Sequence, residues 1–480
     1  MPPCMISHDN TTFVLISFEG PDRYSLAGGL GVRVQGLAST LVEMGYPVHH
    51  FFIGDPYKKG AESSPCSKLT LYRWCQWISH YYPNGVYDGE NDKLNDFNDS
   101  LPDFVVSNII EKEVAKGKTV VILSEEWHTA EVVCRIKGLL QAKGIDDKTI
   151  IFWNANNTFG FDRIDWKRLS QNATITTVSR YMKHLMWDFG INPLVVPNGI
   201  HPNLLRDVDK NQCRKLRNKF TPKTLLSKVA RWDPDKRWNS TVEAVARLKE
   251  KGQQVVLLAR GGIESHGNEV LANAQSLGLK VKSVTSKKDS IEGYLAALEE
   301  AGSFDVLDVK FHIPHSFLRT IYHTSDAVLA NSGHEPFGLV GLETMAASGM
   351  AFTGGTGEDY AIPYYNSIVI ETNDPAEIEE HVLYIKQNPG EDNRMRKSAR
   401  LTAGYFTWSG AVSNLIRKLE YLGLIKGIFS YRELAYITED TLINIEKMSF
   451  NEKVPTGGLN LPLNKPVSAK SMPALISGMS

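Results

Sequence analysis

The sequence alternates short runs of β-branched and other apolar residues with longer amphipathic segments, and this alternation is the strongest constraint on its fold. In the first half, strands are predicted at residues 13–18, 48–53, 120–123, 150–153, 173–178 and 194–196. In the second half they are predicted at 225–230, 255–259, 279–284, 309–313, 327–330 and 368–370. Strand–helix alternation of this kind predicts parallel sheets covered by helices.

The segments between the predicted strands carry the period of a helix. Apolar residues recur at spacings of three and four over residues 34–42, and Gly45 follows where a helix-terminating glycine is expected. In the second half a stripe from Val242 to Leu248 ends at Gly252 in the same way. Both halves therefore predict helices that pack one apolar face onto a sheet.

Two runs of strands and helices, separated by a turn-rich stretch at Pro197-Asn-Gly199, predict two doubly wound α/β domains. The predicted segments are a first domain at 1–200, a second at 201–400, a helix at 401–425 that returns to the first domain, and a tail at 426–480. The tail is rich in Pro, Gly, Ser and Lys without a period, which is typical of a loosely packed segment. In such sheets ligands bind beyond the carboxyl ends of the strands, so two facing domains predict a cleft.

Charge and hydropathy exclude several classes of protein. The 480 residues carry 53 Lys and Arg against 54 Asp and Glu, so there is no basic excess for coating nucleic acid. No run approaches the roughly 20 apolar residues that span a bilayer, and the start of the chain lacks the pattern of a signal peptide. We expect a soluble protein, with peripheral membrane contact through the modestly basic segment 179–187 left open.

Cysteine usage indicates a reducing compartment. The five cysteines are odd in number and include no Cys-x-x-Cys pair. Neither a disulfide framework nor a thiolate zinc site fits this pattern, so a cytoplasmic location is expected.

A glycine-rich loop, Ala27-Gly28-Gly29-Leu30-Gly31, lies between the first predicted strand and the first long helix. Glycines at a helix start let backbone N–H groups approach an anionic ligand. A dinucleotide fingerprint would need a third glycine at position 34, where Val34 stands. An ordinary tight turn between strand and helix remains an alternative.

The second feature is a pair of glutamates, Glu335 and Glu343, in the segment Glu-Pro-Phe-Gly-Leu-Val-Gly-Leu-Glu. Their spacing of eight places them on one side of a helix, with Glu335 in the turn before it. Phe337, Gly338 and Leu339 would offer unpaired amides to a diphosphate. An acid that stabilises the helix dipole, followed by a solvated second acid, is the alternative.

The third feature is Arg231-Trp-Asp-Pro-Asp-Lys236, which follows the predicted strand at 225–230. Arg and Lys in one loop at the carboxyl end of a strand can hold a phosphate, with Arg contributing two parallel hydrogen bonds. A solvated loop is the alternative, but the position after a buried strand favours the phosphate site.

The fourth feature is His128 in Ser124-Glu-Glu-Trp-His, which follows another buried strand. A histidine at a strand end can hydrogen-bond substrate hydroxyls or stabilise charge, although a lone histidine is often structural. Glu125 and Glu126 suggest a two-acid hydrolase, but neighbours on a strand point to opposite faces, which argues against a shared site.

Taken together, these features resemble the retaining glycosyltransferases of family 4, and more distantly the bacterial glycogen synthases, both of which have the two-domain GT-B fold. The resemblance runs from about residue 13 to residue 422. Its most specific element is the pair of glutamates with the trailing Met345-Ala-Ala-Ser-Gly, preceded in the chain by the basic pair. Thr177-Val-Ser and Val196-Pro-Asn-Gly-Ile also resemble landmarks of that family.

On the donor side, the resemblance implies roles for each motif. Arg231 and Lys236 would neutralise the departing diphosphate, Glu335 would contact the donor hexose near its anomeric carbon, and Glu343 would hold the ribose. The amides of Phe337, Gly338 and Leu339 would complete the donor side of the site.

The remaining implied contacts come from loops. Amides around Gly28, Gly29 and Leu30 would face the diphosphate from across the cleft, and His128 would bond the donor sugar. The stretch Thr353-Gly354-Gly355-Thr resembles the family's glycine-rich loop beside the phosphates.

The implied reaction is transfer of a hexose from a nucleotide-diphosphate sugar to a hydroxyl acceptor with retention, by front-face attack in which the acceptor proton passes to the leaving phosphate. No Asp-x-Asp metal site stands out and no cofactor is expected beyond the nucleotide-sugar co-substrate. The chain departs from the family at Glu126, where Asp is usual, at Leu26-Ala27, where some members have Lys, at Trp153-Asn-Ala-Asn-Asn, and at Arg260-Gly-Gly. These departures bear on acceptor contacts.

Aromatic residues concentrate in the first domain and suggest a carbohydrate acceptor site there. Trp74, Trp77 and Asn154 are the predicted acceptor residues. Aromatic faces stack on sugar C–H faces, but aromatic residues are equally ordinary core.

Three other functions remain open at this stage. A pyridoxal-phosphate phosphorylase of the same fold would need a Schiff-base lysine in the cleft, and no lysine stands out. A nucleotide-sugar epimerase or hydrolase would act on the donor without an acceptor. A non-catalytic carbohydrate-binding protein would not need the complete set of charged residues.

Overall fold

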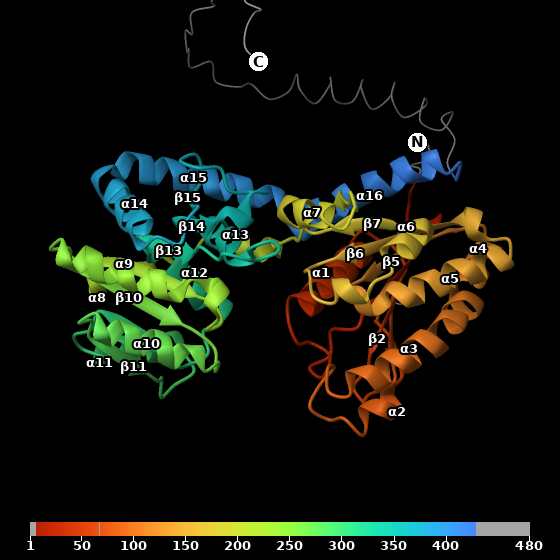
Figure 1. Ribbon diagram of the computed structural model, residues 1–480, viewed down its shortest axis with the longest axis horizontal. Coiled ribbons are helices and arrows are strands. Elements are labelled where there is room, and N and C mark those ends of the chain that lie inside the picture. The colour runs from red at the N-terminus through yellow and green to blue at the C-terminus, as the bar shows by residue number, and fades with distance from the viewer. Residues whose placement is uncertain (1–5, 67, 429–480) are drawn as a thin grey trace, which may run out of the picture. The chain divides into compact units, whose positions relative to one another are not determined.

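The computed structural model describes residues 6–66 and 68–428, and most of the predicted 426–480 tail lies outside the described residues. Two sheets organise this part of the chain (Figure 1). The first has eight strands in the order β3-β4-β2-β1-β5-β6-β7-β8, and the second has seven in the order β11-β12-β10-β9-β13-β14-β15. All neighbours run parallel except β3 and β4, so the predicted α/β class is confirmed.

The first sheet consists of β1 (Thr11–Ile16), β2 (Val48–Ile53), β3 (Ala61–Ser63), β4 (Leu69–Trp74), β5 (Thr119–Glu125), β6 (Thr149–Ala155), β7 (Thr174–Thr177) and β8 (Leu194–Val195). Its helices are α1 (Gly29–Glu43), α2 (Gln76–Ser79), α3 (Glu90–Val105), α4 (Glu111–Ala115), α5 (Ala130–Ala142), α6 (Trp166–Asn172) and α7 (Arg180–Trp187).

The second sheet consists of β9 (Thr224–Val229), β10 (Val255–Arg260), β11 (Val281–Val284), β12 (Val306–Val309), β13 (Ala327–Ala330), β14 (Ala351–Gly354) and β15 (Ile368–Ile370). The helices that follow β8 are α8 (Lys210–Phe220), α9 (Trp238–Glu250), α10 (His266–Ser276), α11 (Ile291–Glu300), α12 (His315–Thr324), α13 (Leu339–Ala346), α14 (Pro375–Gln387), α15 (Pro389–Tyr405) and α16 (Trp408–Ile425).

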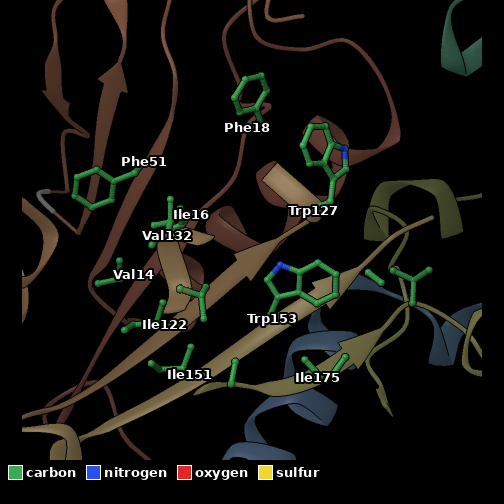
Figure 2. Close-up of a cluster of buried hydrophobic side chains, with 14 of the residues drawn as sticks. Val14, Ile16, Phe18, Phe51, Ile122, Trp127, Val132, Ile151, Trp153 and Ile175 are labelled. Atoms are coloured by element: carbon green, nitrogen blue, oxygen red, sulfur yellow. The ribbon is translucent and has the colours of Figure 1, made fainter. Parts of the chain in front are cut away.

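The central strands carry continuous apolar runs because both faces of the sheet are covered. On β1, Val14 and Ile16 join one core cluster, whereas Phe13 and Leu15 join another. Successive side chains on a strand point to opposite faces, so one continuous apolar run supplies two cores. Figure 2 shows the first of these cores, where Val14 and Ile16 lie with Ile122, Ile151 and Trp153.

The C-terminal helix α16 packs on the first sheet. Its Val412, Leu415 and Leu419 share a core cluster with residues of α1. A Cβ at Gly36 of α1 would lie 2.2 Å from Cε2 of Trp408, so the close approach of the two helices requires glycine there. This packing brings the last described helix beside the first, as Figure 1 shows in blue and red.

The second sheet is also covered on both faces. One core joins Leu257 on β10 to Val242 on α9 and Ile378 on α14. The other joins Leu258, the next residue on β10, to Tyr294 on α11 and Phe317 on α12. The doubly wound architecture predicted from sequence is therefore present in both sheets.

The largest differences from the predictions concern four strands. The strand expected at 309–313 is β12, which lies earlier at Val306–Val309. Its buried Asp308 interrupts the apolar run, and Pro314 then caps α12. β3, β4 and β14 were not predicted, because β3 is a short exposed edge strand, β4 beside it has mostly half-buried residues, and β14 is a short Ala-Phe-Thr-Gly run.

No helix in the described part of the chain is both long enough and apolar enough to span a membrane. The segment considered for peripheral membrane contact forms α7, which buries Met182 and Met186 and leaves the Trp187 side chain exposed.

Candidate active site

A cavity of about 1280 Å³ lies at the carboxyl ends of strands from both sheets. The first sheet contributes residues that follow β1, β5 and β6, and the second contributes residues that follow β9 and β13. This is the position at which doubly wound sheets place their ligands. Most of the residues singled out from the sequence border this cavity.

The basic loop enters the cavity from the second sheet. β9 ends at Val229, and the chain then turns through Arg231 and Lys236 into α9. Nζ of Lys236 lies 3.3 Å from Oε2 of Glu335, which follows β13. Arg231 is largely exposed, and its Nη2 lies 3.8 Å from Oδ2 of Asp233. The structure thus brings three of the four predicted catalytic residues, Arg231, Lys236 and Glu335, to one wall of the cavity.

The N-terminus of α13 faces the same cavity through Phe337, Gly338 and Leu339. Gly338 caps the helix with φ of 77°, and a Cβ there would lie 2.8 Å from the hydroxyl of Tyr360. That hydroxyl donates a hydrogen bond to the Gly338 carbonyl. Within the described residues, the N–H groups of 337–339 have no hydrogen-bond partner, so they are available to an anion.

Glu343 lies within α13, beyond the residues of this helix that line the cavity. Its side chain is half-buried, and burial raises the pKa of its carboxyl to about 7. It does not line the cavity itself. The predicted ribose contact therefore requires the nucleotide to extend past Leu339 along the helix.

Lys228 is a cavity residue that the sequence analysis missed. It lies on β9, is 1 % exposed, and donates hydrogen bonds from Nζ to the Leu329 carbonyl at 3.1 Å and to Oδ1 of Asn331 at 2.6 Å. Burial, together with repulsion from Lys236, lowers its pKa to about 7. A lysine inside an otherwise apolar strand was the signal that could have identified it.

The glycine-rich loop begins α1 but already holds an internal carboxylate. Oε2 of Glu19 accepts hydrogen bonds from the backbone N–H groups of Ala27, Gly28 and Gly31 at 3.1, 2.9 and 3.0 Å. Gly29 and Leu30 line the cavity, and within the described residues their N–H groups have no partner. Of the loop amides predicted to face a diphosphate, only those of Gly29 and Leu30 remain free to bind a ligand.

His128 lines the cavity opposite the basic loop. Its ring stacks between Trp127, at a centroid distance of 3.9 Å, and Phe18, at 4.1 Å (both labelled in Figure 2). Nε2 lies 2.7 Å from Oε1 of Glu90, whereas Nδ1 is buried without a partner in the described structure. Burial lowers the pKa of His128, and its hydrogen bond lowers the pKa of Glu90.

The side chains of Glu125 and Glu126 lie in different surroundings, as expected for neighbouring residues at the end of a strand. Glu125 is buried and accepts two hydrogen bonds from Nε of Arg33, each at 3.1 Å. Glu126 has φ of 70° and ψ of 164°, a backbone conformation that strains any residue except glycine. Its Oε1 accepts the N–H of Asn156 at 2.6 Å, and burial raises its pKa to about 8. The two carboxyls do not form a two-acid pair.

The predicted acceptor residues do not reach the cavity. Asn154 is buried, donates to Oε2 of Glu125 at 2.9 Å and accepts from the Thr176 hydroxyl at 2.8 Å. Trp74 packs against core aromatics and donates its indole N–H to Ser100. Trp77 on α2 is 66 % exposed and lies outside the cavity lining. None of these three residues lines the cavity, and their contact with an acceptor remains a prediction.

Three other residues predicted to bind the donor are also absent from the cavity lining. The N–H of Gly28 is occupied by Glu19, as described above. Gly354 packs so closely on the strand-end loop that a Cβ would lie 2.2 Å from the Ser332 carbonyl oxygen, and Gly355 has open space around it. Neither Gly354 nor Gly355 lines the cavity. Their predicted contact with the phosphates remains a prediction.

No cluster of three or more His, Cys, Asp or Glu side chains suited to a metal ion occurs among the residues that the structure describes.

The two parallel-sheet units, with a cavity lined from the strand ends of both, define the GT-B fold. Residues 209–402 match the family model described as glycosyl transferases group 1. This segment contains both members of the basic pair and both glutamates of α13 and its preceding loop. The match supports a glycosyltransferase, and no curated protein matches the sequence.

Solved structures with the same fold share little sequence with this chain. Sucrose-phosphate synthase from Thermosynechococcus elongatus is 18 % identical, with 85 % of this chain and 99 % of that one covered and a TM-score of 0.59. The catalytic domain of starch synthase IV from Arabidopsis thaliana, bound to ADP and acarbose, is 15 % identical, with coverage of 86 % and 99 % and a TM-score of 0.60. An α,α-trehalose-phosphate synthase (UDP-forming) from Burkholderia xenovorans, in complex with glucose-6-phosphate, is 14 % identical, with coverage of 85 % and 100 % and a TM-score of 0.57. At these identities the likeness shows the fold.

Proposed function

We propose that this protein transfers a hexose from a nucleotide-diphosphate sugar to a hydroxyl acceptor with retention of configuration, as the glycosyltransferases of family 4 do. The observation that carries the proposal is the convergence of Arg231, Lys236 and the α13 N-terminus on one cavity wall, with Glu335 beside Lys236. These groups are the fixed positive potential that a departing diphosphate requires. The starch synthase structure was solved with ADP, which agrees with a nucleotide donor.

Catalysis is then mainly electrostatic. As the anomeric C–O bond breaks, negative charge grows on the diphosphate, and the two cations and the unpaired amides at 337–339 stabilise it without rearranging. Glu335, held 3.3 Å from Lys236, accepts hydrogen bonds from donor hydroxyls. The acceptor attacks from the face that the diphosphate leaves, and its proton passes to the leaving phosphate oxygen.

On the other wall, His128 and the loop after β6 orient the sugars. The imidazole is buried and is fixed by Glu90 and by the two aromatic rings that it stacks against, so the ring has one orientation. Glu126 fixes the following loop through the N–H groups of Asn156 and Asn157. These contacts position groups and do not take part in bond breaking.

The proposal includes activity without a divalent cation or another cofactor, because the protein's own cations would neutralise the diphosphate. Chelation by EDTA should leave transfer unchanged, and loss of transfer that returns with added metal would contradict this. The four described cysteines are unpaired, which agrees with the proposed cytoplasmic location.

The test has two stages. A thermal-shift screen over nucleoside diphosphates and their sugars identifies the donor, because a ligand that binds the folded state raises the melting temperature. NMR of the product formed from that donor then gives its anomeric configuration. A retained configuration supports the proposal, an inverted one contradicts the mechanism, and release of free hexose or an epimer without acceptor indicates the hydrolase or epimerase alternative.

A further inference from the structure

The wall of the cavity formed by the first sheet is acidic. Four carboxyl groups line it, from Glu19, Glu90, Glu126 and Asp162. Among the described lining residues from this sheet, Arg163 is the only Lys or Arg. This wall lies opposite the basic loop, so it is the part of the cavity left for the acceptor once a donor diphosphate occupies the other.

Two of these carboxylates cannot move away from a ligand. Glu19 is 4 % exposed and is held by three backbone N–H groups and by the hydroxyl of Tyr87, at 2.7 Å. Glu90 is held by Nε2 of His128. Three of the amides at the start of α1 therefore already bind a carboxylate. A phosphate that used the open N–H groups of Gly29 and Leu30 would have to approach that carboxylate.

Arg163 alone does not neutralise the charge of a phosphate group on this acidic wall. The Arg163 guanidinium lies 4.6 Å from the ring centroid of Trp127, so it is placed over an aromatic face. A sugar phosphate carries close to two negative charges at neutral pH. On this wall it would meet two fixed carboxylates and the exposed Asp162 carboxylate, against a single Arg.

The same wall suits hydroxyl groups and sugar faces. Carboxylate oxygens accept hydrogen bonds from hydroxyls, and the buried Nδ1 of His128 has no partner in the described structure. Two lining rings present exposed faces, Phe159 at 72 % and Tyr87 at 41 %. Such faces pack against the C–H faces of sugars.

Resting on the transferase activity proposed above, we propose that the acceptor is an uncharged polyhydroxy compound, such as a free sugar or polyol, and that the acidic wall formed by Glu19, Glu90 and Asp162 excludes phosphorylated sugars. This specificity differs from what the names of two similar structures state, sucrose-phosphate synthase and a trehalose-phosphate synthase with bound glucose-6-phosphate. The difference concerns the acidic wall of Glu19, Glu90 and Asp162, here named the acceptor wall. It leaves unchanged the opposite wall of Arg231, Lys236 and residues 337–339, named the donor wall.

The experiment compares matched acceptors that differ only by a phosphate. With the donor fixed by the thermal-shift screen, a panel of monosaccharides, disaccharides and linear polyols is assayed against the phosphate ester of each, glucose with glucose 6-phosphate among them. Since like-charge contacts in such sites cost several kcal/mol, kcat/KM should favour the uncharged member by at least about 100-fold. Equal or greater kcat/KM for a phosphorylated member overturns the proposal.

Two exposed neighbours provide matched charge variants. Asp162→Asn removes a negative charge from the acceptor wall and should lower the ratio of kcat/KM for the uncharged acceptor to that for its phosphate ester. Arg163→Gln removes a positive charge from this wall and should raise the same ratio. Both residues are exposed in a short turn, so the folded state should tolerate either change. A preference that does not respond to either variant overturns the electrostatic explanation.

Donor binding separates this proposal from the one that it rests on. Binding of the nucleotide sugar without acceptor reports on the donor wall alone, so its absence would contradict the transferase activity itself. If the nucleotide sugar binds but no uncharged member of the panel accepts the hexose, the acceptor proposal fails while the donor assignment stands.

Discussion

The two walls of the cavity are built differently. The donor wall places Lys228, Arg231 and Lys236 together with a helix N-terminus whose amides are unpaired in the described structure. The acceptor wall also contains a helix N-terminus, that of α1, but there Glu19 already occupies three amides. The same structural element thus has all its cavity-facing amides open on one wall, whereas on the other only the N–H groups of Gly29 and Leu30 are open and they lie beside the Glu19 carboxylate.

This contrast shows that a glycine-rich helix start is not by itself a phosphate site. What decides is whether the protein supplies its own anion to the N–H groups. At residues 337–339 it does not. At residues 27, 28 and 31 it does, through Glu19, which follows β1. In the proposed function, the charge of each wall would separate the donor from the acceptor.

The largest expected effect comes from removing the donor-wall cations. Arg231→Ala and Lys236→Ala should each lower kcat by about 10²- to 10³-fold, since each group stabilises charge that develops in the transition state. Steady-state kinetics measures the change. Lys215→Ala, an exposed lysine on α8 far from the cavity lining, is the matched control and should leave kcat unchanged. A loss of activity smaller than threefold in both variants would contradict the claim that the donor-wall cations stabilise the leaving diphosphate.

The next largest effect tests the open helix start. Gly338→Ala should destabilise the protein by about 1–3 kcal/mol, because the left-handed backbone at φ of 77° disfavours a Cβ and because that Cβ would approach Tyr360. The variant should also weaken nucleotide binding, because the amides at 337–339 would shift. Thermal unfolding and calorimetric titration measure the two effects.

Gly404→Ala is its control. Gly404 lies near the end of α15 with open space around it and no left-handed backbone, so alanine should be neutral or stabilising there. If both variants lowered the melting temperature equally, the special geometry of Gly338 would not be the cause.

A smaller effect is expected from the titration of Glu343. Its pKa of about 7 lies above the ordinary value of 4.5, so the folded state binds more protons than the unfolded state between these values. Stability contributed by the neutral carboxyl is therefore present below pH 4.5 and is lost as pH rises through 7. If ionised Glu343 accepts hydrogen bonds from the ribose, nucleotide affinity should rise by up to about tenfold from pH 6 to pH 8.

Glu343→Gln removes this titration and is the control for ionisation of the nucleotide phosphates. Its affinity between pH 6 and pH 8 should change only as the phosphates dictate. Identical pH profiles for the variant and the unmodified protein would exclude a role for Glu343 in binding the ribose.

The smallest effects compare aromatic residues inside and outside the cavity. Phe159→Ala should raise the acceptor KM severalfold, because its exposed ring lines the acceptor wall. Trp77→Ala should not change the acceptor KM, because Trp77 is exposed on α2 outside the lining. A higher acceptor KM in Trp77→Ala alone would restore the assignment made from the sequence.

Local sequence patterns were sufficient to predict most strands. β2, β13 and β15 match their predicted ranges, and the helix ends at Gly45 and Gly252 are confirmed, since a continuous apolar run or a terminal glycine is visible within a few residues. The prediction for β12 was displaced because a buried Asp308 broke the apolar run. A polar residue that is buried within a strand cannot be distinguished from a loop residue by local sequence pattern.

The site was predicted where motifs follow strand ends. Arg231, Lys236, Glu335 and His128 all line the cavity, because the topology of a doubly wound sheet carries strand-end loops to one edge. Glu19 was missed since its partners lie 8 to 12 residues further along the chain. The aromatic residues Trp74 and Trp77 were placed in the acceptor site because composition does not reveal which ring faces a cavity.

The central claim is that the donor wall binds a nucleoside diphosphate through Arg231 and Lys236. Isothermal titration calorimetry of ADP, UDP and GDP with the unmodified protein, with the double variant Arg231→Ala/Lys236→Ala and with Lys215→Ala tests it directly. We predict that at least one nucleotide binds the unmodified protein and Lys215→Ala equally and binds the double variant at least about 100-fold more weakly. Equal affinity for all three proteins, or no binding of any nucleoside diphosphate, would contradict the account.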